Sequence, residues 1–302
     1  MTQTPLVSII ILNWNGWRDT IACVESCRKL TWPNFFIVVV DNGSTDGSED
    51  YLRQKLKDVE IIQSGANLGF AGGNNVGIRR ALDRTEYVWL LNNDAVADPV
   101  ALSRLVEAME DRNDAGIAGS KIYYHDEPRK IWFAGGLWEK GKLRLRQRGA
   151  NRIDRGEFEE VSETGSVSGC SMLVRSAVIR NIGLMEECYF LYWEDTEWCA
   201  RAQAKGYKVL FVPGSRVWHK VSASAQQNSF SQYYYFTRNG FFFLREYDPL
   251  LMPLFAVYNL LFGLKCLASL NAQPLRGLAR GFIDFVSGKK GQMRPGRDKI
   301  TS

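Results

Sequence analysis

Short apolar stretches alternate with longer amphipathic stretches over the first third of the chain. The apolar stretches are rich in β-branched residues, which is typical of buried strands in a parallel sheet. The longer stretches repeat their apolar residues at helical spacing. This alternation predicts βαβ units, and therefore an α/β fold with a mostly parallel central sheet flanked by helices. The predicted strands are residues 6–12, 36–40, 59–62 and 87–91, and the predicted helices are residues 17–30, 48–56, 74–82 and 99–111.

Polar residues follow each predicted strand. In sheets of this kind ligands bind beyond the carboxyl ends of the strands, so the residues just after each strand are the first candidates for chemistry. They fall into four groups, residues 13–15, 41–44, 67–75 and 92–94. We expect these groups to lie along one edge of the sheet.

Three of these groups have both a structural and a functional interpretation. Asp41, which Asn-Gly-Ser-Thr-Asp-Gly follows, either caps a turn or accepts the N3 hydrogen of a pyrimidine ring. Residues 67–75 hold three glycines where a helix begins, but they match neither the dinucleotide-binding pattern nor the Walker pattern. Asn92, Asn93 and Asp94 either form an Asx turn or hold a Mg²⁺ or Mn²⁺ ion against two phosphates, because hard cations prefer oxygen ligands.

Two further candidates lie in the second half of the chain. Residues 192–198 read Tyr-Trp-Glu-Asp-Thr-Glu-Trp and open an amphipathic helix. Acidic residues in a first helical turn favour the helix dipole, and a carboxylate beside aromatic rings could equally take a proton from a sugar hydroxyl. His219 follows a strand-like stretch and is either structural or a late ligand of a metal near Asp94. The residues alone leave both pairs of alternatives open.

Residues 250–270 are strongly apolar and are interrupted by Pro253, Asn259 and Lys265. The stretch is about long enough to cross a bilayer, but its polar interruptions and the basic residues after it favour a helix that lies in the membrane interface. A true span and a packing helix of a soluble protein are the alternatives, because periodicity does not separate the three.

Composition and charge narrow the functional classes. With 45% hydrophobic and 24% charged residues among 302, the chain has the composition of a globular protein. Its net charge is +5, but residues 261–302 hold eight Lys or Arg against two Asp, so this tail carries +6 and the rest about −1. This distribution argues against nucleic-acid binding and suits an anionic membrane surface. A second basic stretch, residues 142–148, is either a solvated strand, a mobile loop or a contact for a phosphate-bearing acceptor.

The six cysteines form neither a Cys-x-x-Cys pair nor a Cys/His cluster, which predicts reduced structural thiols. The first residues lack the basic and apolar regions of a secretory signal. We therefore expect a cytoplasmic catalytic body.

Six stretches, taken in order, resemble the motifs of the inverting glycosyltransferases of family 2. Within that family they are similar to the rhamnosyltransferase-like branch of cell-envelope polysaccharide assembly. The resemblance covers about residues 5–245, and its specificity comes from the ordered set. The stretches are Val-Ser-Ile-Ile-Ile-Leu-Asn-Trp-Asn-Gly from residue 7, Val-Val-Val-Asp-Asn-Gly-Ser-Thr-Asp-Gly-Ser from 38, Asn-Leu-Gly-Phe-Ala-Gly-Gly-Asn-Asn from 67, Leu-Leu-Asn-Asn-Asp from 90, Trp-Glu-Asp from 193 and Val-Trp-His from 217.

The resemblance implies a GT-A fold and a role for each candidate residue. Residues 92–94 occupy the position of the family's Asp-x-Asp motif, with Asn92 in place of the first aspartate, and residues 197–198 depart from a more usual Asp-Leu. Residues 238–239, Arg-Asn, resemble a further motif of the branch that has no assigned role. The implied catalytic residues are Asp195, as general base, and Glu194, and the implied acceptor contact is Trp193. The implied ligands of a Mg²⁺ or Mn²⁺ ion are Asp94 and His219. The implied nucleotide-sugar contacts are Leu12, Asn13, Asn15, Asp41, Asn67, Gly72, Asn74, Asn92 and Asn93.

The same resemblance predicts the organisation and activity of the chain. Residues 1–245 would form the GT-A domain, with about 1–115 as the nucleotide-sugar half and about 116–245 as the acceptor and catalytic half, and residues 246–302 a basic, helical, membrane-associated tail. The expected reaction moves a sugar from a nucleoside diphosphate sugar, dTDP-rhamnose first and UDP-hexoses or UDP-N-acetylhexosamines next, to a hydroxyl of a glycan or polyprenyl-linked acceptor. A sugar nucleotidyltransferase and a non-catalytic sugar-binding protein are the alternatives from other classes. The expected location is peripheral, at the inner face of the cell membrane.

Overall fold

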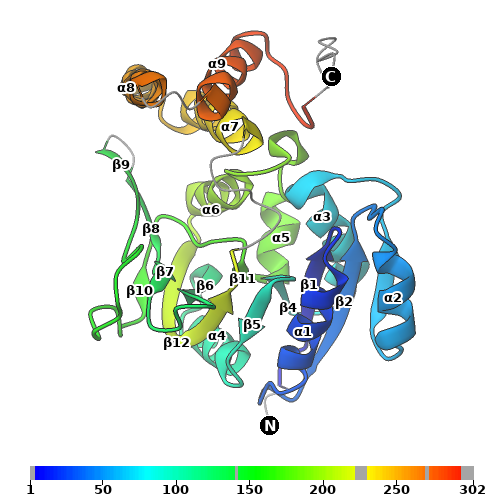
Figure 1. The fold of residues 1–302 in the computed structure, drawn as a ribbon. Helices are drawn as coiled ribbons and strands as arrows, with labels where there is room; N and C mark the ends of the chain where they lie inside the picture. Colours follow the sequence, from blue (N-terminus) through cyan, green and yellow to red (C-terminus); the bar gives the residue numbers. More distant parts are fainter. Residues whose placement is uncertain (1–3, 140–141, 222–229, 269–271, 294–302) are drawn as a thin grey trace.

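The computed structural model describes residues 4–139, 142–221, 230–268 and 272–293. Its centre is a ten-stranded sheet flanked by helices (Figure 1). The strands follow the order β10-β12-β6-β11-β4-β1-β2-β3, with β5 paired to β12 and β7 paired to β6. The predicted α/β class is confirmed. The sheet is mixed rather than mostly parallel, because β11 runs antiparallel to both of its neighbours.

The first four strands are the predicted ones, and each ends one residue after its predicted end. They are β1 (Val7–Asn13), β2 (Phe35–Asp41), β3 (Glu60–Gln63) and β4 (Tyr87–Asn92), and all four are parallel. Their register pairs Asp41 with both Asn13 and Gln63, and Leu12 with Asn92. The carboxyl ends of the four strands therefore lie side by side on one edge of the sheet.

The helices between these strands are also the predicted ones, with shifted ends. They are α1 (Trp17–Cys27), α2 (Ser48–Lys55), α3 (Gly69–Ala81, followed by a short 3-10 turn, Leu82–Arg84) and α4 (Ala101–Glu110). α3 begins five residues before its predicted start. Gly69 has a φ of 74°, and a Cβ there would lie 2.3 Å from the carbonyl oxygen of Phe190. Glycine thus lets α3 begin against the chain that precedes α6.

The strands after β4 complete the same edge of the sheet. Of the strands that follow β4 along the chain, the long ones are β6 (Ala115–Tyr124) and β12 (Lys208–His219), and shorter ones are β5 (Ala95–Ala97) and β11 (Ser171–Arg175). Because β11 is antiparallel to β4, its first residue lies beside the end of β4. β12 is parallel to β6, and β5 pairs Ala95 with His219. The start of β11 and the end of β12 therefore join the edge where β4 ends.

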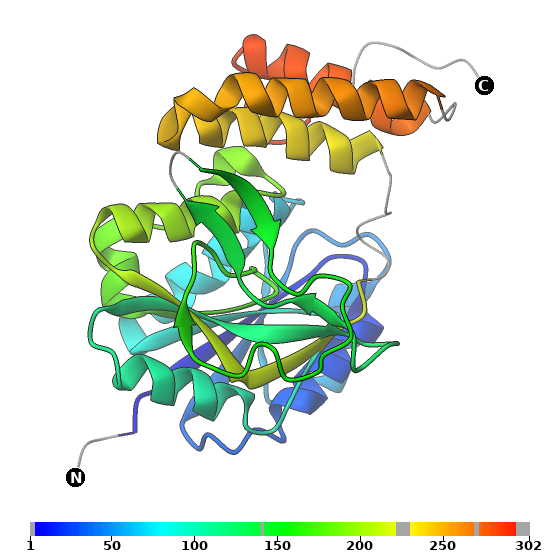
Figure 2. The same ribbon diagram turned by 90° about the vertical axis from the view of Figure 1, so that its left-hand side faces the viewer.

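The remaining elements of the body are short. They are β7 (Ile131–Phe133), β8 (Gly136–Glu139), β9 (Lys142–Gln147), β10 (Ser162–Glu163), α5 (Ser176–Ile182), η2 (Glu187–Tyr189) and α6 (Glu194–Ala204). The basic stretch predicted as a strand or loop is a strand, because β8 and β9 form an antiparallel pair. This pair rises beside α6 toward the C-terminal helices (Figure 2).

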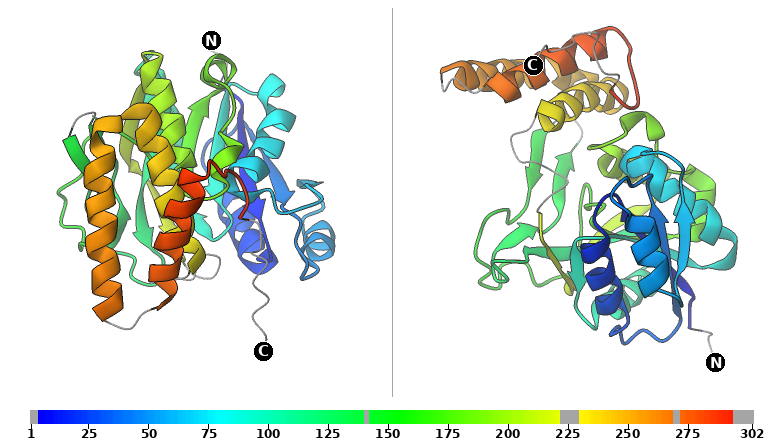
Figure 3. Two further views of the ribbon diagram at one scale, coloured as in Figure 1. Left: turned by 90° about the horizontal axis from the view of Figure 1, so that it is seen from above. Right: turned by 45° about the vertical axis from the view of Figure 1, so that its right-hand side comes forward.

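Three C-terminal helices form a layer across one end of the body. They are α7 (Phe230–Tyr247), α8 (Met252–Ala268, after η3, Pro249–Leu251) and α9 (Ala272–Val286), and they lie side by side (Figures 1 and 3). An apolar cluster that includes Tyr189, Trp193 and Phe243 joins this layer to the chain around α6. The predicted helical C-terminal region is confirmed. The predicted domain boundary at residue 245 falls in the last turn of α7, and the division itself stays a prediction.

The segment around α8 has a large exposed apolar surface. Pro249–Ala268 is long and apolar enough to cross a membrane, with a mean hydropathy of 1.8, and 22% of it is buried. Apolar patches of this extent on a protein surface mark interaction sites. The exposed apolar residues are Leu250, Leu254, Val257, Tyr258, Leu260, Leu261, Leu264 and Leu267 on this segment, and Phe282, Ile283 and Val286 on α9.

Candidate active site

Asp41 ends β2, and side chains of its own chain enclose its carboxylate. It is completely buried, and its oxygens accept hydrogen bonds from Asn13 Nδ2 at 2.7 Å, from Gln63 Nε2 at 2.7 Å and from the Ser44 hydroxyl. These donors stabilise a buried carboxylate and hold it in place. The structure uses these oxygens within the protein, and the hydrogen bond from Asp41 to a pyrimidine base, one of the two interpretations of the sequence, stays a prediction. Asp41 is therefore a support for Asn13 and Ser44.

Asn13 extends this support to the neighbouring loops. Its Oδ1 accepts a hydrogen bond from the Thr20 hydroxyl at 2.7 Å, and Asn93 Nδ2 donates to the same hydroxyl oxygen at 3.1 Å. A Cβ at Gly16 would lie 2.9 Å from Asn93 Nδ2, so glycine allows this close approach. One polar network thus joins the loops that follow β1, β2 and β4.

Asn15 lies on the open side of this network. It is exposed and has a φ of 52°, a left-handed conformation that Asn adopts more readily than most residues. Its Oδ1 accepts a hydrogen bond from Thr45 N–H at 2.8 Å, and its own N–H donates to the Ser44 hydroxyl at 2.9 Å. Trp14 beside it is also exposed. These residues form an exposed part of this edge of the sheet.

The glycine-rich turn at the start of α3 packs closely on β1. A Cβ at Gly73 would lie 2.4 Å from Leu12 Cδ1, and a Cβ at Gly72 would lie 2.8 Å from Leu68 Cβ. Both glycines are buried, and Leu12 is partly buried. Gly73 therefore lets the helix approach the strand, with Leu12 under the turn, and Gly72 leaves room for Leu68 just before the helix.

The asparagines of this turn make hydrogen bonds within it. Asn67 Oδ1 accepts a hydrogen bond from Gly69 N–H at 2.9 Å. Asn74 is buried, and its Nδ2 donates to the carbonyl of Phe70 at 2.9 Å. Both asparagines hold the turn in shape, and Asn67 is the more accessible of the two.

Asp94 and His219 form a close pair where β5 meets the end of β12. His219 Nε2 lies 2.9 Å from Asp94 Oδ1 and 3.3 Å from Asn92 Nδ2. Burial lowers the pKa of His219, but the neighbouring Cys170 and Asp94 side chains raise it, and the net change in the pKa is upward. His219 Nδ1 is buried and has no hydrogen-bond partner within the described part of the chain.

The Asp94–His219 pair fits a divalent cation. Two neighbouring ligands of an octahedral ion, each about 2.1 Å from it, are about 3 Å apart, which matches the spacing of these two atoms. Carboxylate and imidazole both suit a transition metal such as Mn²⁺. Among the residues that the structure describes, no cluster of three or more His, Cys, Asp or Glu side chains could hold a metal. The other ligands would therefore be diphosphate oxygens and water.

Asp195 lies in the first turn of α6 and faces the start of β11. Its Oδ2 accepts a hydrogen bond from Gly169 N–H at 3.0 Å, and its Oδ1 accepts one from Thr196 N–H at 2.6 Å. Burial raises the pKa of Asp195, and these hydrogen bonds oppose the rise. A Cβ at Gly169 would lie 2.8 Å from the Phe70 ring, so glycine lets this loop reach between Asp195 and α3.

Glu194 beside it has a different environment. It is 5% exposed, and its Oε2 is buried without a hydrogen-bond partner in the described residues. Burial, and then the charge of Asp195, raise the pKa of Glu194 well above its usual range. Of two adjacent carboxyl groups, the one that accepts hydrogen bonds ionises first. The hydrogen bonds to Asp195 therefore favour its ionised form, whereas burial favours the neutral form of Glu194.

One loop connects Asp195 to the Asp94–His219 pair. Gly169 donates its N–H to Asp195, and the next residue, Cys170, accepts a hydrogen bond from Asn92 N–H at 3.0 Å through its carbonyl. The structure thus brings Asp94 and Asp195 to one stretch of the edge, and the Asn13 network links Asp41 to it. Sequence reasoning missed this loop, since a glycine before a strand is a weak signal. It also missed Thr20 and Gln63.

Trp193 has a packing role that differs from the predicted acceptor contact. Its ring is 5% exposed, and its indole N–H donates to the carbonyl of Phe236 at 3.0 Å. The ring centroid lies 5.1 Å from that of Phe243 and 6.2 Å from that of Phe255. The C-terminal helices cover most of the ring, and the implied acceptor contact of Trp193 stays a prediction.

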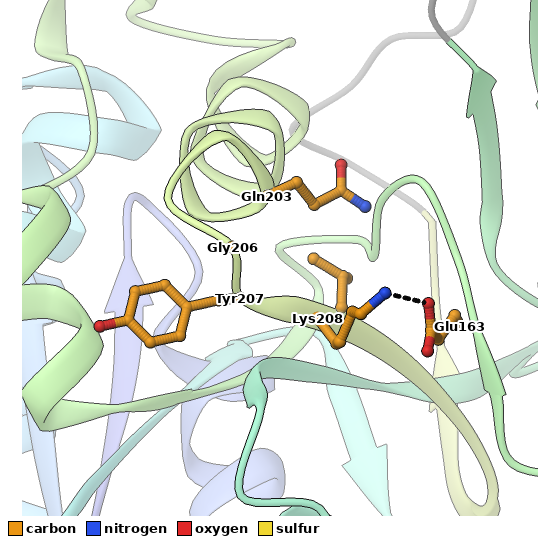
Figure 4. Close-up of a pocket in the computed structure, with 6 residues that line it drawn as sticks. Glu163, Gln203, Gly206, Tyr207 and Lys208 are labelled. Atoms are coloured by element: carbon orange, nitrogen blue, oxygen red, sulfur yellow. Dashed lines mark hydrogen bonds and ion pairs between the residues drawn. The ribbon is translucent and has the colours of Figure 1, made fainter.

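A surface pocket lies at the other end of β12 (Figure 4). It is lined by residues around Lys208, whose ammonium pairs with Glu163 at 3.0 Å. Because β12 begins at Lys208 and ends at His219, this pocket is separate from the candidate site.

Similar proteins agree on the kind of enzyme. At 24% identity, the chain matches the dTDP-rhamnosyl transferase RfbF of Shigella flexneri over 89% of this chain and 91% of the relative. It matches the N-acetylglucosaminyl-diphospho-decaprenol L-rhamnosyltransferase of Mycobacterium tuberculosis, also at 24% identity, over 81% of this chain and 85% of the relative. An uncharacterised protein of Sinorhizobium fredii, y4gI, is 28% identical over 74% of this chain, which spans 25% of that longer protein.

Two solved structures share the fold. GalNAc-T7 with UDP, GalNAc and Mn²⁺ has a TM-score of 0.65 at 18% identity, over 82% of this chain and 50% of that one. The Pyrobaculum calidifontis mannosyltransferase PcManGT with GDP-Man and Mn²⁺ has a TM-score of 0.59 at 14% identity, over 97% of this chain and 77% of that one. Residues 8–182, more than half of the chain, match Glycosyl transferase family 2. Together with the geometry of the sheet edge, this match shows that the chain belongs to glycosyl transferase family 2.

Proposed function

We propose that this glycosyltransferase moves rhamnose from dTDP-rhamnose to a hydroxyl of a glycan or polyprenyl-linked glycan, with inversion, and that Asp195 is the general base. The observation that supports the proposal is the loop at residues 169–170, which binds the Asp195 carboxylate through Gly169 and the backbone of Asn92, two residues before Asp94, through Cys170. The two rhamnosyltransferase relatives favour the donor, because they match over more than four fifths of their own length. UDP-hexoses and UDP-N-acetylhexosamines are the next candidates.

In the proposed reaction, the ionised Asp195 takes the proton of the acceptor hydroxyl. The hydroxyl oxygen forms the new glycosidic bond to the anomeric carbon, and the bond from this carbon to the nucleoside diphosphate breaks on the opposite face. Burial makes Asp195 a stronger base than an exposed carboxylate because it raises the pKa. The neutral Glu194 limits the negative charge beside it.

Asp94 and His219 would hold a divalent Mg²⁺ or Mn²⁺ ion, whose positive charge favours departure of the diphosphate. Asn92 and Asn93 flank this pair. Asn92 orients the imidazole through its side-chain amide, and Asn93 anchors the loop to Thr20. Asn15 and the turn at residues 67–74 are proposed to face the nucleotide.

We further propose that the enzyme attaches to the inner face of the cell membrane through α8 and α9. The exposed aliphatic side chains of these helices supply apolar area, and basic residues nearby suit anionic lipids. A polyprenyl-linked acceptor would then be presented in the same membrane. In this proposal residues 1–245 carry out the transfer reaction, and residues 246–302 bind the enzyme to the membrane. The nearby exposed basic residues are Lys265, Arg276, Lys289 and Lys290.

Product analysis tests the proposal. The full chain is incubated with dTDP-rhamnose, UDP-glucose or UDP-N-acetylglucosamine, with Mn²⁺ and N-acetylglucosaminyl-diphospho-decaprenol. We expect dTDP release and a rhamnosylated lipid. Release of pyrophosphate would instead show a nucleotidyltransferase, and binding without release would show a non-catalytic sugar-binding protein.

The metal site has a readout that does not need turnover. A ligand that binds the folded state raises the melting temperature. We expect Mn²⁺ with dTDP to stabilise the wild-type protein and to stabilise His219→Gln much less. The exposed residue His125, changed to Gln, is the matched control and should keep the full shift. Equal stabilisation of all three proteins would exclude His219 as a metal ligand.

A further inference from the structure

The chain between η2 and α6, residues 189–193, has an unusual backbone. Three of its residues have left-handed φ angles, 63° at Phe190, 66° at Tyr192 and 78° at Trp193. Such angles are unfavourable for residues with a large side chain, and they persist only where surrounding contacts impose them. This connection leads directly into Glu194 and Asp195. Whatever holds it also determines where the first turn of α6 begins.

Asn239, in the middle of α7, holds this connection. It is completely buried, and its Nδ2 donates hydrogen bonds to three carbonyls of the connection. The three distances are 2.7 Å to Tyr189, 2.8 Å to Leu191 and 3.0 Å to Tyr192. Its Oδ1 accepts a hydrogen bond from Arg238 Nε at 2.9 Å, which fixes the orientation of the amide. Both polar atoms of the Asn239 side chain, Nδ2 and Oδ1, thus have hydrogen-bond partners within the protein.

Arg238 ties the same connection to two other segments. It is 1% exposed, and its Nη2 donates to the carbonyl of Tyr189 at 3.3 Å. Its Nη1 donates to the carbonyl of Gly291, beyond α9, at 2.8 Å and to the hydroxyl of Tyr234 at 3.1 Å. Its planar group also lies over the rings of Tyr234 and Tyr235. Because the guanidinium of Arg238 is planar and its donors point in fixed directions, these contacts hold the three segments in one relative arrangement.

The opposite side of the connection touches the glycine-rich turn at the start of α3, called the donor turn below because it is proposed to face the nucleotide. The carbonyl of Phe190 accepts a hydrogen bond from Phe70 N–H at 2.7 Å, and Gly69 leaves just enough room for that carbonyl. The Phe70 ring lies against Gly169, whose N–H holds Asp195. The connection is therefore in contact with the first turn of α3 on one side and continues into α6 on the other.

From these contacts we infer that Arg238 and Asn239 are positioning residues of the transfer reaction. They hold the 189–193 connection in its strained form, and the connection fixes Asp195 relative to the donor turn at Gly69 and Phe70. They act through these segments and not on the substrates. The inference rests on the proposed role of Asp195 as the general base.

The first test is hydrogen exchange on the substrate-free full chain. Asn239→Ala removes the donor to the three carbonyls. Asn259→Ala is the matched control, because Asn259 on α8 bonds only to Thr237 and Phe255 among the hydrogen bonds described. We expect Asn239→Ala to speed exchange at least tenfold in peptides covering residues 69–71, 168–170 and 194–197, and Asn259→Ala to leave them unchanged. Faster exchange in α7 to α9 alone would overturn the inference.

The second test is kinetic, with dTDP-rhamnose and N-acetylglucosaminyl-diphospho-decaprenol. We expect Asn239→Ala to lower kcat about 10- to 100-fold with the donor KM within threefold, because small displacements of a positioned base are costly. Arg238→Lys, which keeps the charge and loses the planar fork, is the milder variant should Asn239→Ala not fold. A wild-type kcat in a folded variant of either kind would overturn the inference.

Asp195→Asn, measured alongside, separates this inference from the proposed function. An inactive Asp195→Asn with a fully active Asn239→Ala would overturn only the positioning role. A fully active Asp195→Asn would overturn the proposed general base, and the hydrogen-exchange result would still decide whether Asn239 holds the connection.

Discussion

The two sides of the strand edge differ in how their polar groups are satisfied. Around the ends of β1 and β2, the side chains of Asp41 and Asn13 find their partners within the protein. Around β12 and α6, His219 Nδ1 and Glu194 Oε2 are buried without a hydrogen-bond partner among the described residues. Buried polar atoms are normally paired, so unpaired ones indicate function. The first side is a scaffold whose polar groups are satisfied within the protein, and the unpaired atoms of the second side support its proposed roles in ligand binding and proton transfer.

Asp195→Asn should have the largest effect, because it removes the proposed base from the second side. The amide cannot accept a proton, so we expect kcat to fall about 10²- to 10⁴-fold, while the scaffold keeps donor affinity close to wild type. Release of nucleoside diphosphate measures kcat, and titration calorimetry measures the affinity for the donor. Asp111→Asn, at an exposed position after α4, should keep both values. Turnover near the wild-type rate would refute the assignment.

Asp41→Asn tests the scaffold side. The new amide keeps one acceptor oxygen but places its NH2 group against either the Asn13 or the Gln63 amide, so the network would lose one of its two buried acceptors. We expect the free energy of unfolding to fall by about 3 kcal/mol, a factor of about 100 in the unfolding equilibrium. Urea unfolding measures it. Asp58→Asn is the control, because its exposed ion pair with Arg28 should contribute less than about 1 kcal/mol. Equal stabilities of the two variants would show that the network is not a scaffold.

A double change on α8, Leu260→Ser with Leu261→Ser, tests the proposed attachment. Both side chains are about 60% exposed, so the change should leave the fold intact and remove apolar area from the outer face. We expect binding to vesicles of phosphatidylglycerol and phosphatidylcholine to weaken at least tenfold. Val161→Ser, exposed before β10, should bind as the wild type does. Unchanged binding of the α8 variant would place the contact elsewhere.

Glu194→Gln gives the smallest expected effect. The folded-state pKa of Glu194 is raised, so the unfolded state ionises more readily, and the stability of the wild type falls as pH rises from about 4 toward that raised pKa. Glutamine removes this loss. We expect the variant to be more stable than the wild type by about 1 kcal/mol at pH 7.5 and by nothing at pH 4, measured by urea unfolding at both values. A gain that is the same at both pH values would contradict a neutral Glu194.

Much of the fold was predictable from local patterns. Buried parallel strands consist of β-branched runs, and helices repeat their apolar residues, so the first four strands could be placed to within one residue at their ends. The rule that ligands bind at the carboxyl ends of strands then selected Asp41 and Asp94. The start of α3 was missed, because it depends on the contact of Gly69 with Phe190, 121 positions away.

The roles of single side chains were harder to predict, because they depend on distant partners. The acceptors of Asp41 are filled by Asn13 and Gln63, which lie on neighbouring strands. Trp193 was expected to face an acceptor, but the C-terminal helices cover its ring. A sequence gives residue types and spacing, and it does not give the packing of segments that are far apart along the chain.

The anomeric configuration of the product tests the central claim most directly. If Asp195 is a base in a single displacement, the first product must have the anomeric configuration opposite to that of the donor sugar. Nuclear magnetic resonance of the product within the first turnovers, before any spontaneous change, gives the answer. We predict inversion. Retention would require a nucleophile on the enzyme in place of a base, and it would contradict the role assigned to Asp195.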